Sequence, residues 1–129
     1  MRHRGPDDRG LDFFELGNKS LVLGQTRLSI IDLSSGGHQP FFDVSKRYCL
    51  VFNGEIYNYK ELRSKLKSRN YKFKTESDTE VLLYAWIEWR EEVLINLKGM
   101  FAFSIYDSHL KKITIVRDAF GIKPLLAAI

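Results

Sequence analysis

The stretch from Leu50 to Tyr59 reads Leu-Val-Phe-Asn-Gly-Glu-Ile-Tyr-Asn-Tyr and constrains the fold more than any other part of the chain. Its apolar start is typical of a strand. The Asn53-Gly54 pair that follows is a strong turn signal, because both residue types tolerate a positive φ. We therefore predict a bend at Asn53-Gly54, a short extended stretch after it, and a helix that opens at Asn58, a good N-cap.

Three kinds of polar group meet at this predicted bend. Asn53 offers a side-chain amide, Gly54 an unencumbered backbone N–H, and Glu55 a carboxylate. Polar groups gathered where two rigid elements join suit the recognition of a small polar ligand. The alternative is a plain hairpin turn with no ligand.

The composition places limits on the class of protein. A chain of 129 residues that is 44% hydrophobic fits one domain, residues 1–129, with a sizeable core. It contains no apolar run of about 18 residues and no signal-peptide pattern, so we expect a cytoplasmic protein without a membrane span. One cysteine, Cys49, and three scattered histidines offer no metal-ligand spacing, so we expect no metal site.

A basic segment between Lys60 and Lys74 supplies much of the net charge of +4. These residues lie on and just after a predicted helix, where a solvated face is the usual explanation. Only Tyr71 and Phe73 could stack on bases there, so we expect no nucleic-acid partner.

The remaining pattern predicts short strands and two or three helices. A capping box, Ser77-Asp78-Thr79-Glu80, is the clearest local signal in the chain and marks the start of the second helix. Residues 1–10 are expected to form a loop. The expected strands are Asp12–Leu16, Ser20–Leu23, Arg27–Leu33, Tyr48–Asn53, Phe101–Asp107 and Lys112–Val116, and the expected helices run from Asn58 to Asn70 and from Ser77 towards Gly99, with a break near Arg90. Hairpin-connected strands with few helices predict an α+β domain, an antiparallel sheet covered by helices.

Three residues have both a structural and a functional interpretation. Arg27 is either a surface charge or a planar clamp for a carboxylate. Asp78 either stabilises the first turn of its helix or holds a ligand ammonium group. Cys49 lies within an expected strand and is interpreted as a small packed hydrophobe rather than a nucleophile.

Seven blocks of the sequence, in order and with matching spacing, resemble one family. The blocks are His3-Arg4-Gly5-Pro6-Asp7-Asp8, Arg27-Leu28-Ser29-Ile30-Ile31-Asp32, Gln39-Pro40, Phe52-Asn53-Gly54-Glu55-Ile56-Tyr57-Asn58, Ser77-Asp78-Thr79-Glu80-Val81, Gly99-Met100-Phe101-Ala102-Phe103, and Arg117-Asp118 with Gly121-Ile122-Lys123-Pro124-Leu125. They resemble the class II glutamine amidotransferase domain of asparagine synthetase over essentially the whole chain. Any one block is weak, but seven in order are not.

The resemblance implies a four-layer αββα sandwich of the N-terminal-nucleophile hydrolase type. It also implies hydrolysis of the glutamine side-chain amide by an N-terminal cysteine, whose α-amine serves as the base. The ammonia would pass to an ATP-using synthetase domain or subunit that activates aspartate. ATP and magnesium belong to that domain, so we expect no cofactor in this chain.

The resemblance also implies roles for individual residues. The Asn53 side chain and the Gly54 N–H would form an oxyanion hole. Arg27 would hold the glutamine α-carboxylate, and Asp78, helped by Glu55, would hold the α-ammonium group. The pocket would be lined by the adjoining residues Leu28, Ser29, Ile30 and Ile31.

The chain also departs from the family pattern. The family begins with a cysteine-bearing strand and a helix, which we expect to be missing here together with the nucleophile. Gln25 stands where the family usually has a histidine, and Leu125-Leu126-Ala127 replaces the expected Leu-Tyr-Tyr. A missing first strand would leave an edge that invites pairing with another copy, hence a homo-oligomer.

These observations leave two hypotheses. The chain is either an incomplete glutaminase domain of an asparagine synthetase-like enzyme, inactive by itself without the nucleophile, or a non-catalytic glutamine-binding or assembly module.

Overall fold

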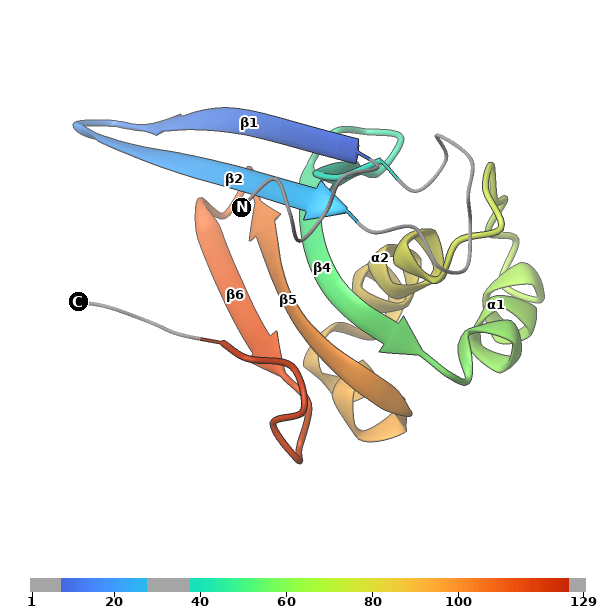
Figure 1. Ribbon diagram of the computed structural model, residues 1–129. Helices are drawn as coiled ribbons and strands as arrows, with labels where there is room; N and C mark the ends of the chain where they lie inside the picture. Colours follow the sequence, from blue (N-terminus) through green and yellow to red (C-terminus); the bar gives the residue numbers. More distant parts are fainter. Residues whose placement is uncertain (1–7, 28–37, 126–129) are drawn as a thin grey trace.

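The computed structural model describes residues 8–27 and 38–125, with the backbone alone for Asp8 and Arg27. It has three layers: helices, a four-stranded antiparallel sheet, and a two-stranded hairpin (Figure 1). The sheet has the order β3-β4-β5-β6, formed by Phe41–Phe42, Tyr48–Ile56, Gly99–Asp107 and Lys112–Arg117. The hairpin consists of β1 (Asp8–Leu16) and β2 (Lys19–Arg27), and the helices are α1 (Tyr59–Lys67), α2 (Asp78–Trp89) and the 3-10 helix η3 (Arg90–Asn96).

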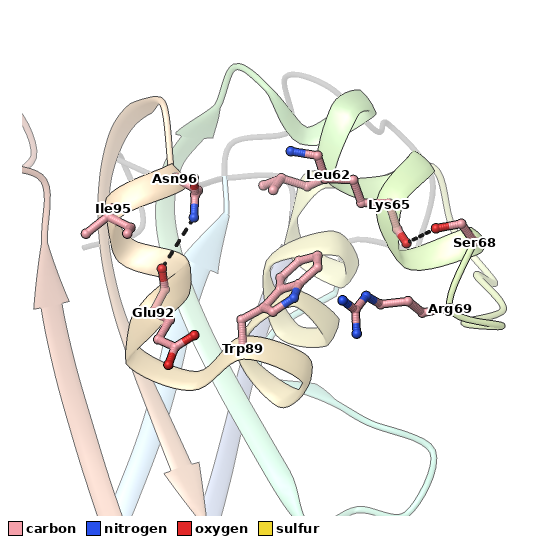
Figure 2. Close-up of a pocket in the computed structure, with 8 residues that line it drawn as sticks. All are labelled: Leu62, Lys65, Ser68, Arg69, Trp89, Glu92, Ile95 and Asn96. Carbon is pink, nitrogen blue, oxygen red and sulfur yellow. Dashed lines mark hydrogen bonds between the residues drawn. The ribbon is translucent and has the colours of Figure 1, made fainter.

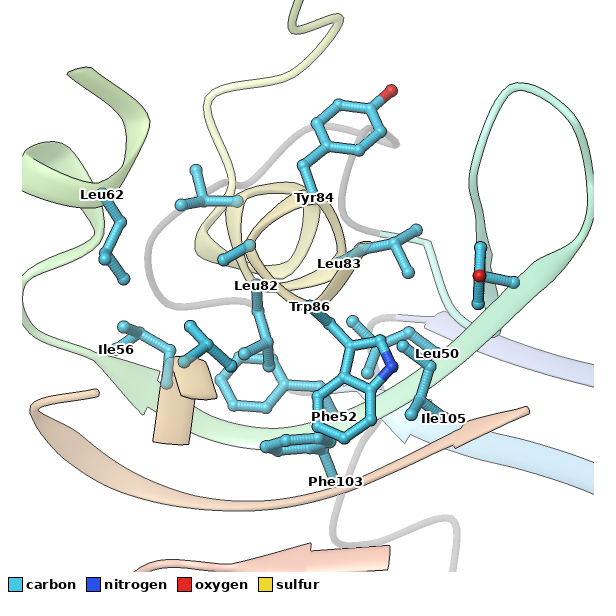
Figure 3. Close-up of a cluster of buried hydrophobic side chains, with 14 of the residues drawn as sticks. Leu50, Phe52, Ile56, Leu62, Leu82, Leu83, Tyr84, Trp86, Phe103 and Ile105 are labelled. Atoms are coloured by element: carbon cyan, nitrogen blue, oxygen red, sulfur yellow. The ribbon is translucent and has the colours of Figure 1, made fainter. Parts of the chain in front are cut away.

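The main core lies between the sheet and the helices. Because successive strand residues point to opposite faces, Leu50, Phe52 and Ile56 of β4 all face α2. They pack with Leu82, Leu83 and Trp86, and the Trp86 ring meets Phe103 edge-on at 6.1 Å between centroids (Figure 3). Helix α2 is therefore buried along most of its length.

A second, smaller core lies on the opposite face of β4. Cys49 and Tyr106 pack there against Leu23 of the hairpin, and Phe14 approaches Tyr106 at 4.7 Å between ring centroids. Cys49 is 1% exposed, and burial raises the pKa of its thiol to about 12. The prediction that Cys49 is a packed hydrophobe is confirmed.

The predicted first hairpin is confirmed, but its strands are longer than expected. A Gly17-Asn18 turn joins them, with Gly17 at φ 70°, and pairing continues to Asp8 opposite Arg27. The prediction of a loop over residues 1–10 is therefore wrong for residues 8–10. Arg27 ends β2, and the rest of the strand expected over residues 27–33 lies outside the described residues.

The N-terminus of α2 is confirmed at the predicted position, with Ser77 as N-cap. The Ser77 side chain accepts from the Glu80 N–H at 3.3 Å. The Glu80 carboxylate does not return to the Ser77 N–H. It accepts instead from the Thr75 and Lys74 N–H groups at 2.7 and 2.9 Å. The expected break near Arg90 is also confirmed, since α2 ends there and η3 begins.

The predicted bend at Asn53-Gly54 is wrong, because both residues lie within a strand. Strand β4 runs on to Ile56, and the turn comes at Tyr57-Asn58. The reason is that β5 pairs with β4 along its whole length, and Gly54 adopts φ 147° within the strand.

The predicted helix from Asn58 to Asn70 is shorter in the structure, where α1 ends at Lys67. Asn58 is its N-cap, but its side chain makes no capping bond. The Asn58 amide instead donates to the Asn96 carbonyl at 2.9 Å and accepts from the Lys98 N–H at 3.0 Å. It thereby joins the start of α1 to the end of η3.

No helix in the described part of the chain is long and apolar enough to cross a membrane.

Candidate functional site

Among the described residues, no strand covers one edge of the end of β4. Strand β3 pairs only with Leu50 and Cys49, so beyond that point no described strand pairs with the edge of β4 that faces away from β5, which we call the open edge. At Phe52 two glutamine side chains bond to the backbone groups that a neighbouring strand would otherwise engage. Gln39 Oε1 accepts from the Phe52 N–H at 2.6 Å, and Gln25 Nε2 donates to the Phe52 carbonyl at 3.1 Å.

Four residues further on, the same edge is held by Asp78. Its Oδ2 accepts from the Ile56 N–H at 3.0 Å, and the side chain is 6% exposed. Burial raises the pKa of Asp78, and the backbone N–H groups around the carboxylate oppose that rise. Asp78 is the first residue of α2, so this bond joins the start of α2 to the end of β4.

Gly54 lies between these two attachments. Backbone N–H groups alternate along a strand, so the Gly54 N–H faces the same open edge as those of Phe52 and Ile56. Its partner on β5 is Phe101. The Phe101 N–H donates to the Asp118 carboxylate and the Phe101 carbonyl accepts from the Asp118 N–H, so both groups point away from β4. Within the described residues, no side chain accepts from the Gly54 N–H.

Only glycine fits at this position. A Cβ on Gly54 would lie 2.1 Å from the Met100 carbonyl oxygen and 2.7 Å from the Phe101 Cα. The φ of 147° is also a value that side-chain-bearing residues rarely adopt. The glycine is therefore required by the close approach of β5, whereas the sequence had been interpreted in terms of a turn.

Asn53 and Glu55 point to the other face of β4, the hairpin side, because they alternate with the residues that face α2. Asn53 is exposed and Glu55 is half-buried. The negative charge of Glu55 adds to the rise in the pKa of Asp78. The structure thus places Asp78 next to Ile56 and within electrostatic reach of Glu55, at the end of the strand that carries Asn53 and Gly54.

The other predicted site residues cannot be compared in the same way. The Arg27 side chain and Leu28, Ser29, Ile30 and Ile31 lie outside the described residues. The backbone of Arg27 is two residues beyond Gln25, which bonds to Phe52. The end of β2 therefore lies against β4 (Figure 1), at the point where Gln25 bonds to Phe52.

Gln25 and Gln39 were not predicted as site residues. The sequence showed Gln25 only as a departure from the family pattern and Gln39 only as part of a matching block. Their contacts with Phe52 span 27 and 13 residues. No local pattern signals such contacts.

A separate cavity of about 490 Å³ lies between α1 and η3 (Figure 2). It is lined by Leu62, Lys65, Ser68, Arg69, Trp89, Glu92, Ile95 and Asn96. Its two cations already have partners, because Lys65 pairs with Glu61 at 2.7 Å and Arg69 with Glu88 at 2.5 Å. It shares no residue with the edge of β4. The described residues contain no group of three or more His, Cys, Asp or Glu side chains placed to hold a metal ion.

Comparisons with known proteins agree with one another. A family model described as a glutamine amidotransferase domain matches residues 1–128. The chain is 47% identical over 123 residues to the glutamine-hydrolysing asparagine synthetase 1 of Bacillus subtilis (strain 168), covering 95% of this chain and 19% of that protein. It is 44% identical over 125 residues to asparagine synthetase B of Escherichia coli (strain K12), covering 97% and 22% respectively.

The fold is similar to that of a solved amidotransferase. Glutamine phosphoribosylpyrophosphate amidotransferase from B. subtilis, complexed with ADP and GMP, matches with a TM-score of 0.65 and 25% identity. The match covers 80% of this chain and 24% of that one. The chain thus spans about a fifth of the length of the curated relatives it matches.

Proposed function

Because the chain belongs to the glutamine amidotransferase domain family, with relatives among the asparagine synthetases, we propose that it binds glutamine at the open edge of β4. The family resemblance seen in the sequence is confirmed, and so is the α+β fold of the N-terminal-nucleophile type. The observation that carries the proposal is the Gly54 N–H, which faces an edge held open between Phe52 and Ile56.

The proposed pocket recognises the glutamine side chain by its carbonyl oxygen. The Gly54 N–H and the Asn53 side-chain amide supply two donors towards that oxygen. Two preorganised donors stabilise the negative charge that develops on such an oxygen when a nucleophile attacks the amide carbon. The support for Asn53 is its exposure beside Gly54.

The two charged ends of the amino acid require opposite charges. We assign the α-carboxylate to Arg27, whose planar guanidinium matches a carboxylate, and line the pocket with Leu28–Ile31. We assign the α-ammonium group to Asp78, with Glu55 beside it. Support for Asp78 comes from its link to Ile56, two residues beyond Gly54. A bound ammonium group would also offset the unfavourable burial of its carboxylate.

We propose that this 129-residue chain does not hydrolyse glutamine by itself. Its only cysteine is Cys49, which is buried in β4 with a pKa near 12, so it provides no thiolate nucleophile at neutral pH. Hydrolysis of glutamine to glutamate and ammonia, and ATP-dependent amidation of aspartate, are proposed for an enzyme in which this domain works with a synthetase domain or subunit. We propose that the protein is cytoplasmic.

Titration calorimetry with L-glutamine tests the binding site. Arg27→Ala is expected to weaken binding at least tenfold, because a charge-assisted carboxylate contact is lost. Lys19→Ala removes an exposed cation at the other end of β2 and is expected to leave the affinity unchanged. Equal affinities for Arg27→Ala and the unsubstituted chain, or no binding of glutamine at all, would refute the proposal. Ammonia release by the isolated chain would refute its inactivity.

A further inference from the structure

We propose that Gln25 and Gln39 are positioning residues that aim the Gly54 N–H at the substrate carbonyl. The inference rests on the proposed function, since it assigns a purpose to the donor that we place in the oxyanion hole. Neither glutamine touches the reacting atoms. Each acts through the backbone of β4.

The two side chains hold consecutive peptide groups. Gln39 accepts from the N–H of the peptide between Val51 and Phe52, and Gln25 donates to the carbonyl of the next peptide. The peptide after that carries the Gly54 N–H. Further along, Asp78 holds the Ile56 N–H. The Gly54 peptide is therefore fixed from both sides.

Side chains can bond to the Phe52 backbone without also occupying the Gly54 N–H, which a paired strand would do. A neighbouring backbone strand that bonded to Phe52 would continue in register and bond to Gly54 as well, because ladder bonds recur at every second residue. The donor would then be occupied. A side-chain amide satisfies the groups of Phe52 and ends there, which leaves the next N–H on that edge facing outward.

The hairpin fixes the positions of the two glutamines relative to each other. Gln25 is paired with Gly10 across β1 and β2. A Cβ on Gly10 would lie 2.1 Å from the Gln39 carbonyl oxygen, so the backbone of Gln39 packs directly on Gly10. One point of the hairpin therefore contacts both positions.

Burial makes the arrangement rigid. Gln39 is 4% exposed, and a buried amide that loses its partner carries an unsatisfied polar group. Gln25 is half-buried. The Gln39 side chain is thus confined to the geometry in which its Oε1 meets the Phe52 N–H.

A matched pair of isosteric changes tests the inference. Gln25 donates to Phe52 whereas Gln39 accepts from it, so glutamate should fail at position 25 and function at position 39. The first readout is the residual dipolar coupling of the Gly54 N–H, which reports the direction of that bond in the free protein. We expect it to change in Gln25→Glu and to stay as in the unsubstituted chain in Gln39→Glu.

The second readout is the preference for L-glutamine over L-norleucine, which has a similar length but lacks the amide. Gln25→Glu is expected to lower that preference about tenfold, with norleucine affinity unchanged. Gln39→Glu is expected to keep it within about twofold, which is small on the scale of one hydrogen bond. A general loss of stability would weaken both ligands alike.

The outcomes separate the two proposals. An unchanged Gly54 coupling in folded Gln25→Glu, or identical behaviour of the two glutamate variants, would overturn the positioning role. If glutamine does not bind the unsubstituted chain, the proposed function fails, and the Gly54 coupling alone decides the present inference. If either glutamate variant does not fold, Gln25→Met removes the donor without adding charge and is expected to change the coupling as Gln25→Glu does.

Discussion

Gly54 is required by the packing of β5 against β4 and also carries the N–H that we propose as a donor to the substrate. We expect Gly54→Ala to lower the free energy of unfolding by about 2–4 kcal/mol, because it combines an unfavourable φ with a clash against β5. Urea denaturation measures the change. Gly17→Ala is the control, since Gly17 also has a positive φ but a Cβ there meets open space. Equal losses for the two variants would mean that backbone strain alone, not the approach of β5, requires glycine at Gly54.

The pair formed by Asp107 and Arg47 makes the stability of the fold depend on pH. Two hydrogen bonds from Arg47, at 2.9 and 2.7 Å, hold the pKa of the Asp107 carboxyl well below its ordinary value. The unfolded chain therefore takes up a proton first as the pH falls. The pair stabilises the fold above about pH 4, and this contribution is lost as the pH drops towards the folded-state pKa.

Asp107→Asn should accordingly be less stable at neutral pH and show a flatter loss of stability in acid. Urea midpoints measured from neutral pH down to about pH 3 test this, because the window then spans the ordinary carboxyl pKa. Glu92→Gln, at an exposed position on η3, should follow the unsubstituted chain. An Asp107→Asn profile parallel to that of the unsubstituted chain would contradict the assignment.

The site could be predicted in part from these residues' own chemistry. Asn53, Gly54 and Asp78 were identified from the sequence and from the family resemblance, and the structure joins Asp78 to Ile56, two residues beyond Gly54. Gln25 and Gln39 were missed because their partner, Phe52, is distant in sequence and offers only backbone groups. A residue whose role is to hold another's peptide bond leaves no compositional signal.

Among the elements, the start of α2 carries a testable difference from a simple capping box. Ser77→Ala should cost about 1 kcal/mol, the usual value for an N-cap. Glu80→Ala should cost more, about 2–4 kcal/mol, because Glu80 is buried and its loss leaves the Thr75 and Lys74 N–H groups without an acceptor. Thermal unfolding measures both, with Glu91→Ala on η3 as the exposed control. The reverse order would show that the cap dominates.

The elements also show why some boundaries were predictable. The start of α2 depends on groups three residues apart, so the sequence reveals it. The start of β1 and the end of β4 depend on partners far along the chain, namely Asp8 opposite Arg27 and Ile56 opposite Gly99. Local turn signals at Asn53-Gly54 were overridden by that long-range pairing, and the fold class was recovered even though this boundary was not.

At the scale of the whole molecule, the hairpin exposes an apolar outer face. Phe13 is 73% exposed and lies beside Val22 and near Leu11 on that face. Both edges of the two-stranded hairpin are also unpaired within the described residues. We therefore expect the isolated chain to associate with itself as the protein concentration rises.

Phe13→Ser should reduce that association while leaving the unfolding free energy within about 0.5 kcal/mol, as is usual at exposed sites. Sedimentation velocity over a series of concentrations measures it. Ile95→Ser, which removes an exposed apolar side chain from η3 instead, is the control and should change nothing. A monomer at every concentration, or equal effects of the two substitutions, would exclude the hairpin face as the interface.

The open edge of β4 serves the proposed binding of glutamine but also exposes the protein to aggregation. An edge kept accessible for a small molecule also presents its amide to any other extended polypeptide, and such edges template aggregation. A molecule that occupies the open edge would block that route. Saturation with glutamine should then slow aggregation of the chain in concentrated solution. The effect should exceed what the ligand-induced increase in the free energy of unfolding alone explains.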